Sequence, residues 1–573
     1  MSEADTAIQQ CIEQRKSFVL DAGAGSGKTY SLAQALRYLC GTKRGEMSRA
    51  GQSIACITYT NAARDEITER TGAQALIRAS TIHDFLWHVI QPHQNALKAA
   101  LIKFNLKLDA ESSRKKDDVE LREALVQVPV TYSDTGSNFL EGRLHHDDLL
   151  SVAHIVFTDN PFLSRLVAAK YPYVLVDEYQ DASMAVINIL LACLLPANPD
   201  DVVVGLFGDQ LQNIFHGGEH PGVGEIPAPL LSKLTRIPKG ENHRCSVAVI
   251  QLLNRIRTDI EQYPMDKNVE GSAIYLRMDG DATDALARAR HFVATELRWS
   301  SSRARDKELY LTHRLIAKKA GYDGVLEVFT KRGSSYRDRL LNGEDRRIAF
   351  FLDRVEPLAE AWSANNSGRT LSILRASGYE FSRNQGKKAA CEALDQFIRL
   401  RDKATIRAVL EHIRDARLFP LLDEFTDRLA APIDAQRVAL MDSEAEEREA
   451  REWEFYTGFF GLTYDQVRSY TAFFNEHTPF ATKHGVKGKE FDTVFVVLND
   501  KGANWNLYSF DKYLSGEDAS ANPARFRRTR NVFYVCCSRA IRNLAVVDLG
   551  KQYASKRQGA EALFGVDRCF RLE

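Results

Sequence analysis

The stretch that decides the fold is Ala22-Gly23-Ala24-Gly25-Ser26-Gly27-Lys28-Thr29. It follows the apolar run Phe18–Leu20, which predicts a strand, and it precedes Tyr30–Cys40, which predicts a helix. Small residues let backbone N–H groups close around phosphate oxygens, and the helix N-terminus adds its positive dipole end. The sequence therefore predicts a phosphate-binding loop, in which Lys28 reaches the β- and γ-phosphates and Thr29 ligates Mg²⁺.

A second stretch supplies the acids that such a loop needs. Tyr173–Val176 is an apolar strand that ends in Asp177 and Glu178. Strand ends in open parallel sheets face the ligand crevice, so both carboxylates are expected beside the loop. Asp177 can hold Mg²⁺ there, and Glu178 can orient and deprotonate the attacking water. The two stretches together predict a site that hydrolyses a nucleoside triphosphate.

Further strands extend this pattern into two α/β units. Near-continuous apolar runs separated by helical stretches favour parallel sheets that are covered on both faces. The candidates fall into two sets that lie far apart in the sequence: Phe18–Leu20, Ile54–Thr58, Tyr173–Val176 and Val202–Phe207, then Ala273–Leu276, Glu308–Thr312, Val494–Leu498 and Leu544–Val547. Two helical tracts, about 86–144 and about 326–474, interrupt them. The predicted fold class is α/β with two parallel sheets and two helical insertions.

Composition limits how this chain could bind nucleic acid. The 573 residues include 76 Lys and Arg against 76 Asp and Glu, so the formal net charge is zero. A basic field over the whole molecule is therefore excluded, and binding must come from local patches and aromatic faces. The cluster Arg525–Arg530 is one candidate phosphate patch, although a helix start or a solvated face explains it equally well.

Targeting and redox signals point to the cytoplasm. The sequence from Met1 to Asp5 lacks the basic and apolar regions of a signal peptide, and no apolar run is long enough for a membrane span. The nine cysteines contain no CxxC pair, which argues against a structural zinc or iron–sulfur site. We expect reduced thiols in a cytoplasmic protein.

Short motifs follow one another in an order typical of one family. Each is weak alone, but together with the loop and the acidic strand they are specific. The chain resembles superfamily 1 helicases of the UvrD/Rep/PcrA type in these segments: Thr58–Asn61, Ser80–Phe85, Asp147–Leu150, Tyr173–Asp181, Gly208–Phe215, Asn242–Arg244, Thr482–Asp492 and Val532–Ala540.

The resemblance implies two RecA-like domains, each with a helical insertion, and a 3′-to-5′ polarity on DNA. ATP and Mg²⁺ are the implied cofactors. The boundaries that follow are 1–85 and 145–235 for the first RecA-like domain, 86–144 for its insertion, 236–325 and 475–573 for the second RecA-like domain, and 326–474 for its insertion.

The resemblance also implies roles at the nucleotide. Gln212 would sense the γ-phosphate, and Arg244 and Arg539 would contact it from the second domain. Arginine suits that task because its fork is planar and always charged. The remaining nucleotide contacts implied are Glu490 at the ribose, Gln10 (or Gln9) at the adenine, and His243, which either stacks on adenine or is simply packed.

Strand contacts are implied at seven positions: Tyr59, Asn61, His83, Phe85, Phe215, Thr482 and His484. Stacking on aromatic rings tolerates any base, which suits a motor without sequence preference. For Tyr59, His83, Phe85 and Phe215, a core role remains the open alternative.

The sequence departs from the family after Phe215. The family usually continues with an aromatic residue, an Arg and a Gly, whereas this chain reads His216-Gly217-Gly218-Glu219-His220. One stacking platform and one DNA-coupled arginine are therefore in doubt, and strand separation with them.

The compact layout resembles the helicase-like subunit of the Gabija anti-phage system. No nuclease motif is expected in the chain, so the resemblance implies a separately encoded nuclease of the OLD/TOPRIM type as partner. Three alternatives stay open beside a translocating helicase: a DNA-end or single-strand sensor that activates such a nuclease, a general DNA-repair helicase, and a scaffold with a vestigial ATP site.

Overall fold

The structure is a computed structural model of residues 1–573. It describes the chain except at residues 1, 73, 110–111, 113, 134–136, 215–220, 280–281, 300–305, 311–312, 344, 380–382, 431–443, 476–479, 483–488, 501–507, 551–552 and 573.

A six-stranded parallel sheet forms the first α/β unit, with strand order β3-β2-β6-β7-β1-β8. Its central strands are apolar on both faces, as expected for a covered parallel sheet. The strands are β1 (Phe18–Ala22), β2 (Ile54–Thr58), β3 (Ile77–Thr81), β6 (Tyr173–Asp177), β7 (Val203–Gly208) and β8 (Thr235–Lys239).

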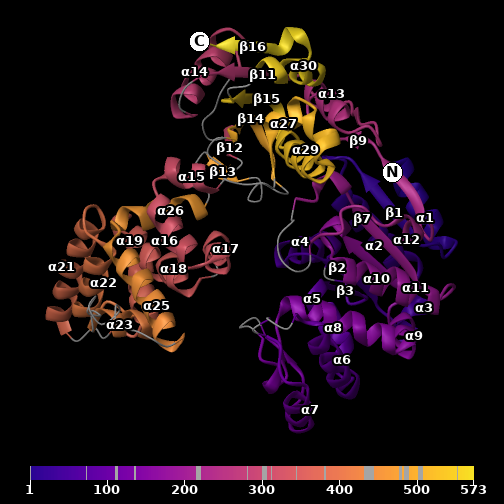
Figure 1. Cartoon of the computed structure of the whole chain (residues 1–573), viewed down its shortest axis with the longest axis horizontal. Helices are drawn as coiled ribbons and strands as arrows, with labels where there is room; N and C mark the ends of the chain where they lie inside the picture. The colour runs from indigo at the N-terminus through magenta and orange to yellow at the C-terminus, as the bar shows by residue number, and fades with distance from the viewer. Residues whose placement is uncertain are drawn as a thin grey trace.

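Helices cover both faces of this sheet (Figure 1). Alternate residues of each strand enter opposite cores: Phe18 and Leu20 pack with α1 and α2, whereas Val19 joins the core of the other face. The covering helices are α1 (Glu3–Glu13), α2 (Lys28–Thr42), α4 (Asn61–Thr71), α5 (Ile82–Ile90), α8 (His146–Asp159) and α9 (Pro161–Lys170).

The second α/β unit has a six-stranded parallel sheet of its own, with order β13-β12-β14-β15-β11-β16. The strands are β11 (Ser272–Met278), β12 (Asp306–Tyr310), β13 (Phe480–Thr482), β14 (Phe491–Leu498), β15 (Ala540–Asp548) and β16 (Cys569–Leu572). One face is covered by α13 (Val247–Ile256), α29 (Pro523–Cys537) and α30 (Tyr553–Phe564).

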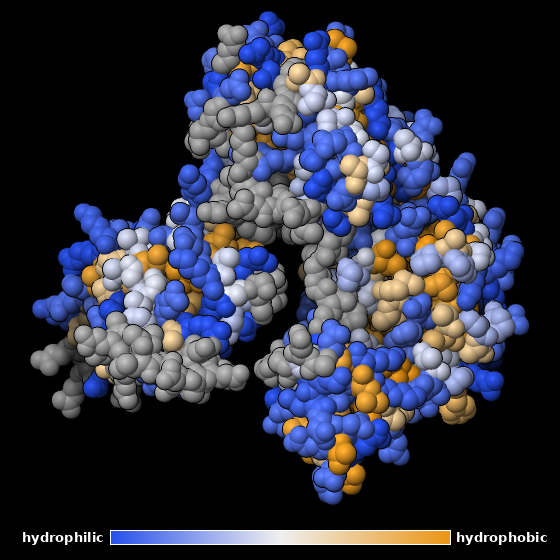
Figure 2. Space-filling model, in the orientation of Figure 1, coloured by the Kyte–Doolittle hydropathy of each residue, from blue (hydrophilic) through white to orange (hydrophobic). Residues whose placement is uncertain are grey.

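Two helical lobes extend from the sheets. The lobe of the first unit contains α6 (Gln94–Lys107) and α7 (Asp118–Gln127), with the short pair β4 (Thr131–Tyr132) and β5 (Arg143–Leu144). The lobe of the second unit runs from α16 (Asp323–Arg332) to α26 (Tyr464–Phe474) and holds a large aromatic core. Figures 1 and 2 show open space between the two lobes.

The predicted fold class is confirmed, and the apolar strands lie where the sequence indicated them. The sequence predicts the inner strands of both sheets and misses the four edge strands, which are β3, β8, β13 and β16. The start of the helical tract expected over about 86–144 is divided between two helices, because Pro92 separates α5 from α6. Among the described residues, no helix has the length and hydropathy needed to cross a membrane.

Candidate nucleotide site between the two units

The phosphate-binding loop connects β1 to α2 as predicted. Gly25 and Gly27 have φ angles of 75° and 78°, a region that favours glycine. A Cβ at Gly25 would lie 2.8 Å from both Arg244 Cβ and Asn242 Oδ1, so the second unit packs directly on the loop. The buried Ser26 Oγ has no hydrogen-bond partner in the described chain. An oxyanion in the loop would satisfy this hydroxyl.

Lys28 and Glu178 meet at the carboxyl edge of the first sheet, beyond the ends of β1 and β6. Lys28 Nζ lies 2.9 Å from Glu178 Oε2, and the lysine side chain is only 10% exposed. Burial alone would lower the pKa of Lys28, but the carboxylates of Glu178, Asp209 and Asp177 raise it, so the ammonium stays charged. Glu178 has a φ of 49°, and such strain in a residue that is not glycine is typical of functional sites.

Thr29 and Asp177 fit a Mg²⁺ ion. Thr29 lies in the first turn of α2, and Asp177 ends β6. Burial and the neighbouring Glu178 carboxylate raise the pKa of Asp177 to about 7, so a cation beside it would favour the ionised form. The described residues contain no cluster of three His, Cys, Asp or Glu that could hold a metal. A Mg²⁺ ion needs only one or two protein ligands when phosphates and water complete its shell.

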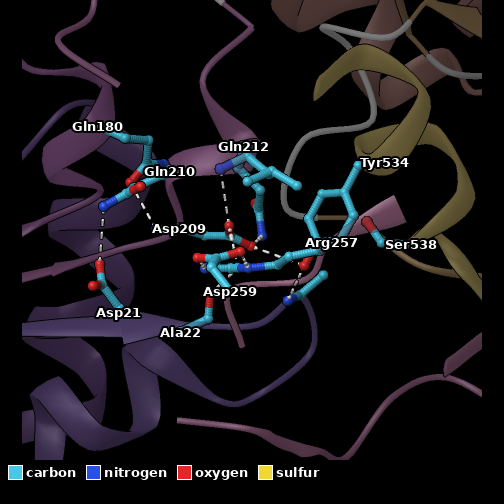
Figure 3. Close-up of polar contacts among 12 residues, drawn as sticks. Asp21, Ala22, Gln180, Asp209, Gln210, Gln212, Arg257, Asp259, Tyr534 and Ser538 are labelled. Carbon is cyan, nitrogen blue, oxygen red and sulfur yellow. Dashed lines mark hydrogen bonds and ion pairs between the residues drawn. The ribbon is translucent and has the colours of Figure 1, made fainter. Parts of the chain in front are cut away.

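Asp209 is the centre of a buried polar network (Figure 3). Arg257 Nη1 donates to Asp209 Oδ1 over 2.8 Å, and neither side chain is exposed. Gln212 Nε2 donates to Asp209 Oδ2 over 2.9 Å, and the Asp209 backbone N–H donates to Gln180 Oε1 over 3.0 Å. Gln180 in turn donates to Glu178. This series of contacts joins Glu178, the expected general base, to Gln212, the expected γ-phosphate sensor.

The same network crosses from one unit to the other. Arg257 follows α13 of the second unit, and its Nη1 also donates to the Ala22 carbonyl over 2.9 Å. Tyr534, on α29, donates to Asp209 Oδ2 over 3.3 Å and accepts the Ala24 N–H over 2.9 Å. The loop that would hold phosphate is therefore bonded to both units.

Two more arginines of the second unit lie close together at this interface. Arg244 pairs with Glu490 over 2.6 Å. Arg539 is 1% exposed and donates through Nε to the Val535 carbonyl over 3.0 Å. Burial and the nearby Arg244 guanidinium lower the pKa of Arg539 to about 10. A phosphate that both guanidinium groups contact would stabilise these two neighbouring positive charges.

The residues expected around the nucleoside occupy the rim of this interface. His243 is exposed, and its backbone N–H donates to the Gly25 carbonyl over 2.9 Å. Glu490 has a side chain that is 52% exposed. Gln10 is exposed on α1, which packs on α2 and β8. The roles of these three residues stay predictions.

The expected strand contacts are less uniform. Tyr59 is 41% exposed at the end of β2, and Asn61 is exposed at the start of α4. His83 is half-buried on α5, with its ring 4.7 Å from that of His146. Thr482 ends β13. Phe215 and His484 lie outside the described residues.

For Phe85 the structure favours the core role that the sequence left open, over a contact with the DNA strand. Its side chain is 3% exposed and belongs to the core between the sheet and α8. Its ring contacts the Tyr171 ring, with centroids 5.5 Å apart. Phe85 lies two residues after His83, so on a helix the two side chains point in different directions. Phe85 is a packing residue in this fold.

Sequence reasoning missed the residues that join the two units. Tyr534 lies within the motif Val532–Ala540, which implies no role for it, although an aromatic residue with a hydroxyl inside an apolar helix needs a buried partner. Asp209 lies shortly before the expected sensor Gln212, and the resemblance likewise implies no role for it. Arg257 carried no signal at all, because its partner lies 48 residues away.

The fold and the site together resemble those of P-loop ATPases of the helicase type: two parallel α/β units meet at a phosphate-binding loop, with acids on one side and arginines on the other. A sequence model described as "AAA domain" matches residues 5–218. Over 676 aligned positions the chain is 24% identical to the Gabija protein GajB of Bacillus cereus (strain HuB5-5), and the alignment covers 94% of each protein. These similarities confirm the resemblance to superfamily 1 helicases and, within them, to GajB.

Proposed function

We propose that the chain is an ATP-driven translocase or helicase that moves 3′ to 5′ on single-stranded DNA. The observation that supports this most is the composition of the interface between the units. Lys28 and Glu178 lie on one side, Arg244 and Arg539 lie on the other, and the loop between them is built for phosphate. A site divided in this way makes closure of the two units depend on the nucleotide.

The chemistry follows from the ion pair between Lys28 and Glu178. A bound γ-phosphate would compete with Glu178 for the Lys28 ammonium, because phosphate carries more charge than a carboxylate. Glu178 would then be free to orient and deprotonate water, while Arg244 and Arg539 stabilise the charge that develops on the transferred phosphoryl group. Thr29 and Asp177 would hold Mg²⁺, which supplies further charge neutralisation.

Coupling to DNA would use Asp209 and Gln212. Gln212 is 5% exposed and held by Asp209, and three residues later the chain reaches Phe215, an expected strand contact. Movement of the short segment between Gln212 and Phe215 would transmit the state of the γ-phosphate to a bound strand.

The decisive experiment measures ATP hydrolysis with and without single-stranded DNA, together with displacement of a strand from a duplex that carries a 3′ tail. We expect stimulation by single strands and ATP-dependent displacement, with Glu178→Gln inactive in both assays. If no form of DNA stimulates ATP hydrolysis, the proposed motor is refuted.

A second candidate is a DNA-end or single-strand sensor that hydrolyses ATP and activates a partner nuclease without processive unwinding. Two observations favour it. The aromatic residue and the Arg that the family usually carries after Phe215 are replaced by His216 and Gly217, and Phe85 is buried. Fewer rings are then available to grip a strand during translocation. Hydrolysis stimulated by ends without strand displacement would select this candidate.

The likeness to GajB suggests a role in phage defence. We infer that the chain acts with a separately encoded nuclease of the OLD/TOPRIM type, with residues 326–474 as one candidate surface. Co-expression with the neighbouring gene, followed by size-exclusion chromatography, tests the complex. Separate elution at micromolar concentrations would favour a general DNA-repair helicase instead.

A further inference from the structure

The first sheet has a free edge with an open groove beside it. In the described part of the chain, β3 pairs with β2 alone. The groove has a volume of about 400 Å³, and its polar and aromatic lining comes from β3, α4 and α5. We call it the edge groove and define it by Arg64, Arg78, Ser80, Trp87, His88 and Gln91.

Chain geometry places these side chains together. Arg78 and Ser80 are two residues apart on β3, so they point to one face of the strand. Trp87, His88 and Gln91 share one face of α5, because their spacing of three and four residues follows the helix. The opposite face of α5 is buried in the core of the first unit.

Two buried donors in the edge groove lack partners. Arg78 Nε and Ser80 Oγ are inaccessible to solvent and make no hydrogen bond within the described chain. Both groups can donate, and a buried donor without an acceptor is costly. An oxyanion bound beside these side chains would supply the missing acceptor, and arginine is well suited to phosphate.

The charge around the groove also favours an anion. Asp84 is the only acid in the lining, against Arg64 and Arg78. Arg64 pairs with the exposed Asp65 over 2.8 Å, a type of surface pair that contributes little and exchanges readily. Burial, Arg78 and Lys170 lower the pKa of His88, so its neutral ring can donate to or accept from a ligand.

A row of rings connects the edge groove to His83. The Trp87 and Tyr132 ring centroids are 5.9 Å apart, those of Tyr132 and His146 are 5.4 Å apart, and those of His146 and His83 are 4.7 Å apart. All four side chains are partly accessible to solvent. Rings interleaved with basic groups are the arrangement by which proteins bind single strands without sequence preference.

We propose that the edge groove is a further binding site for single-stranded DNA, in which Arg78 and Ser80 take a phosphate and the face of Trp87 takes a base. The inference rests on the proposed function, because the strand is expected to reach His83 first. The row of rings favours a continuous DNA strand, and not a free nucleotide, as the ligand of the edge groove. The site would also replace part of the stacking surface that the sequence after Phe215 lacks.

The test measures dissociation constants for single-stranded oligonucleotides of increasing length, by fluorescence anisotropy at fixed salt. Trp87→Ala is expected to weaken binding of long oligonucleotides about fivefold or more. Oligonucleotides that are too short to extend beyond His83 should bind Trp87→Ala with the same dissociation constant as wild type. Arg78→Gln should lower the log–log salt slope by about 0.7, the contribution of one phosphate. Trp87→Phe keeps a ring and should restore most of the affinity.

Matched controls separate the groove from general effects. Phe162→Ala removes an aromatic side chain that is 65% exposed on α9, and Arg49→Gln removes an exposed arginine of the same unit. Neither should change the length dependence. ATP hydrolysis without DNA should be unchanged in Trp87→Ala and Arg78→Gln, since neither residue contacts the nucleotide site. Trp87 packs against the core of the first unit, so Trp87→Ala is expected to lower the melting temperature, and binding is compared at a temperature where circular dichroism shows both variants folded.

The outcomes distinguish the two proposals. If wild type binds no single strand of any length, the proposed function fails before the groove is tested. If wild type binds and both groove variants match the controls at every length, the edge groove is overturned as a strand site. Competition by deoxyadenosine monophosphate that abolishes the difference between wild type and Arg78→Gln would assign the groove to free nucleotides instead.

Discussion

The candidate nucleotide site is built in the opposite way to the surface around Tyr59 and Asn61, which is expected to contact single-stranded DNA and which we call the strand-facing surface. At the nucleotide site, Asp209 and Arg257 are fully buried and share hydrogen bonds with both units. On the strand-facing surface, Tyr59 is 41% exposed and Asn61 projects from the first turn of α4.

The difference follows from what each region has to do. Phosphoryl transfer depends on positioning and on charge stabilisation, so its groups have to be preorganised in a dry site. A motor that moves along DNA has to release each base again, so its contacts are few, exposed and tolerant of sequence. Substitutions should therefore affect turnover in the first region and affinity in the second.

The largest effect is expected at Lys28 and Glu178. Lys28→Ala should abolish nearly all ATP hydrolysis, and Glu178→Gln should lower kcat by about 10²- to 10⁴-fold, the usual contribution of a general base. Glu178→Gln should still bind ATP, which equilibrium binding of a fluorescent ATP analogue measures. Glu46→Gln, at an exposed glutamate of the same unit, is the control. Wild-type turnover in Glu178→Gln would remove this residue from the role of base.

The arginines of the second unit come next. Arg244→Ala and Arg539→Ala should each lower kcat at least about 10²-fold with a smaller change in ATP affinity, since arginine fingers contribute roughly 10³–10⁵. Steady-state kinetics gives both values. Arg557→Ala removes an arginine with a side chain that is 63% exposed on α30 and should be silent. Near-normal kcat in both single variants would mean that the second unit does not complete the site.

A pair of aromatic residues tests the strand-facing surface. Tyr59→Ala should weaken binding of single-stranded DNA by about 1–3 kcal/mol, the usual value of one stacked base, and leave stability unchanged. Phe85→Ala should instead cost about 3–5 kcal/mol of stability, because it leaves a cavity in the core. Binding titrations and chemical denaturation of both variants decide this. A folded Phe85→Ala protein with a specific loss of DNA affinity would restore the original expectation for Phe85.

The smallest effect is expected at Tyr534. Tyr534→Phe removes only the hydroxyl that joins the Ala24 N–H to Asp209. One such hydrogen bond contributes about 0.5–1.5 kcal/mol, so kcat should fall about two- to tenfold. Tyr470→Phe, at a buried tyrosine of the helical lobe, is the control. An unchanged kcat in Tyr534→Phe would show that this bridge does not affect the chemical step.

The same contrast explains what sequence alone could predict. The loop at Lys28 and the acids at Asp177 and Glu178 were found because their spacing is local and each follows an apolar strand. The edge strands β3 and β8 were missed because they are polar on one side and lack a continuous apolar run. The sequence could not decide between the two roles of Phe85, because the motif gives residue types, whereas burial depends on which face of α5 packs on the sheet. Arg257 could not be found, since only the folded chain brings it to Asp209.

The ion pair between Arg257 and Asp209 also affects how the protein should melt. Parting the two α/β units would expose both charges and break the bonds from Arg257 and Tyr534 to the loop, which costs several kcal/mol for a buried pair. We therefore expect the two sheets to unfold cooperatively, as a single calorimetric transition, although each also packs against a hydrophobic core of its own. A bound nucleotide should raise the temperature of that shared transition, because it would add a further bond across the same interface.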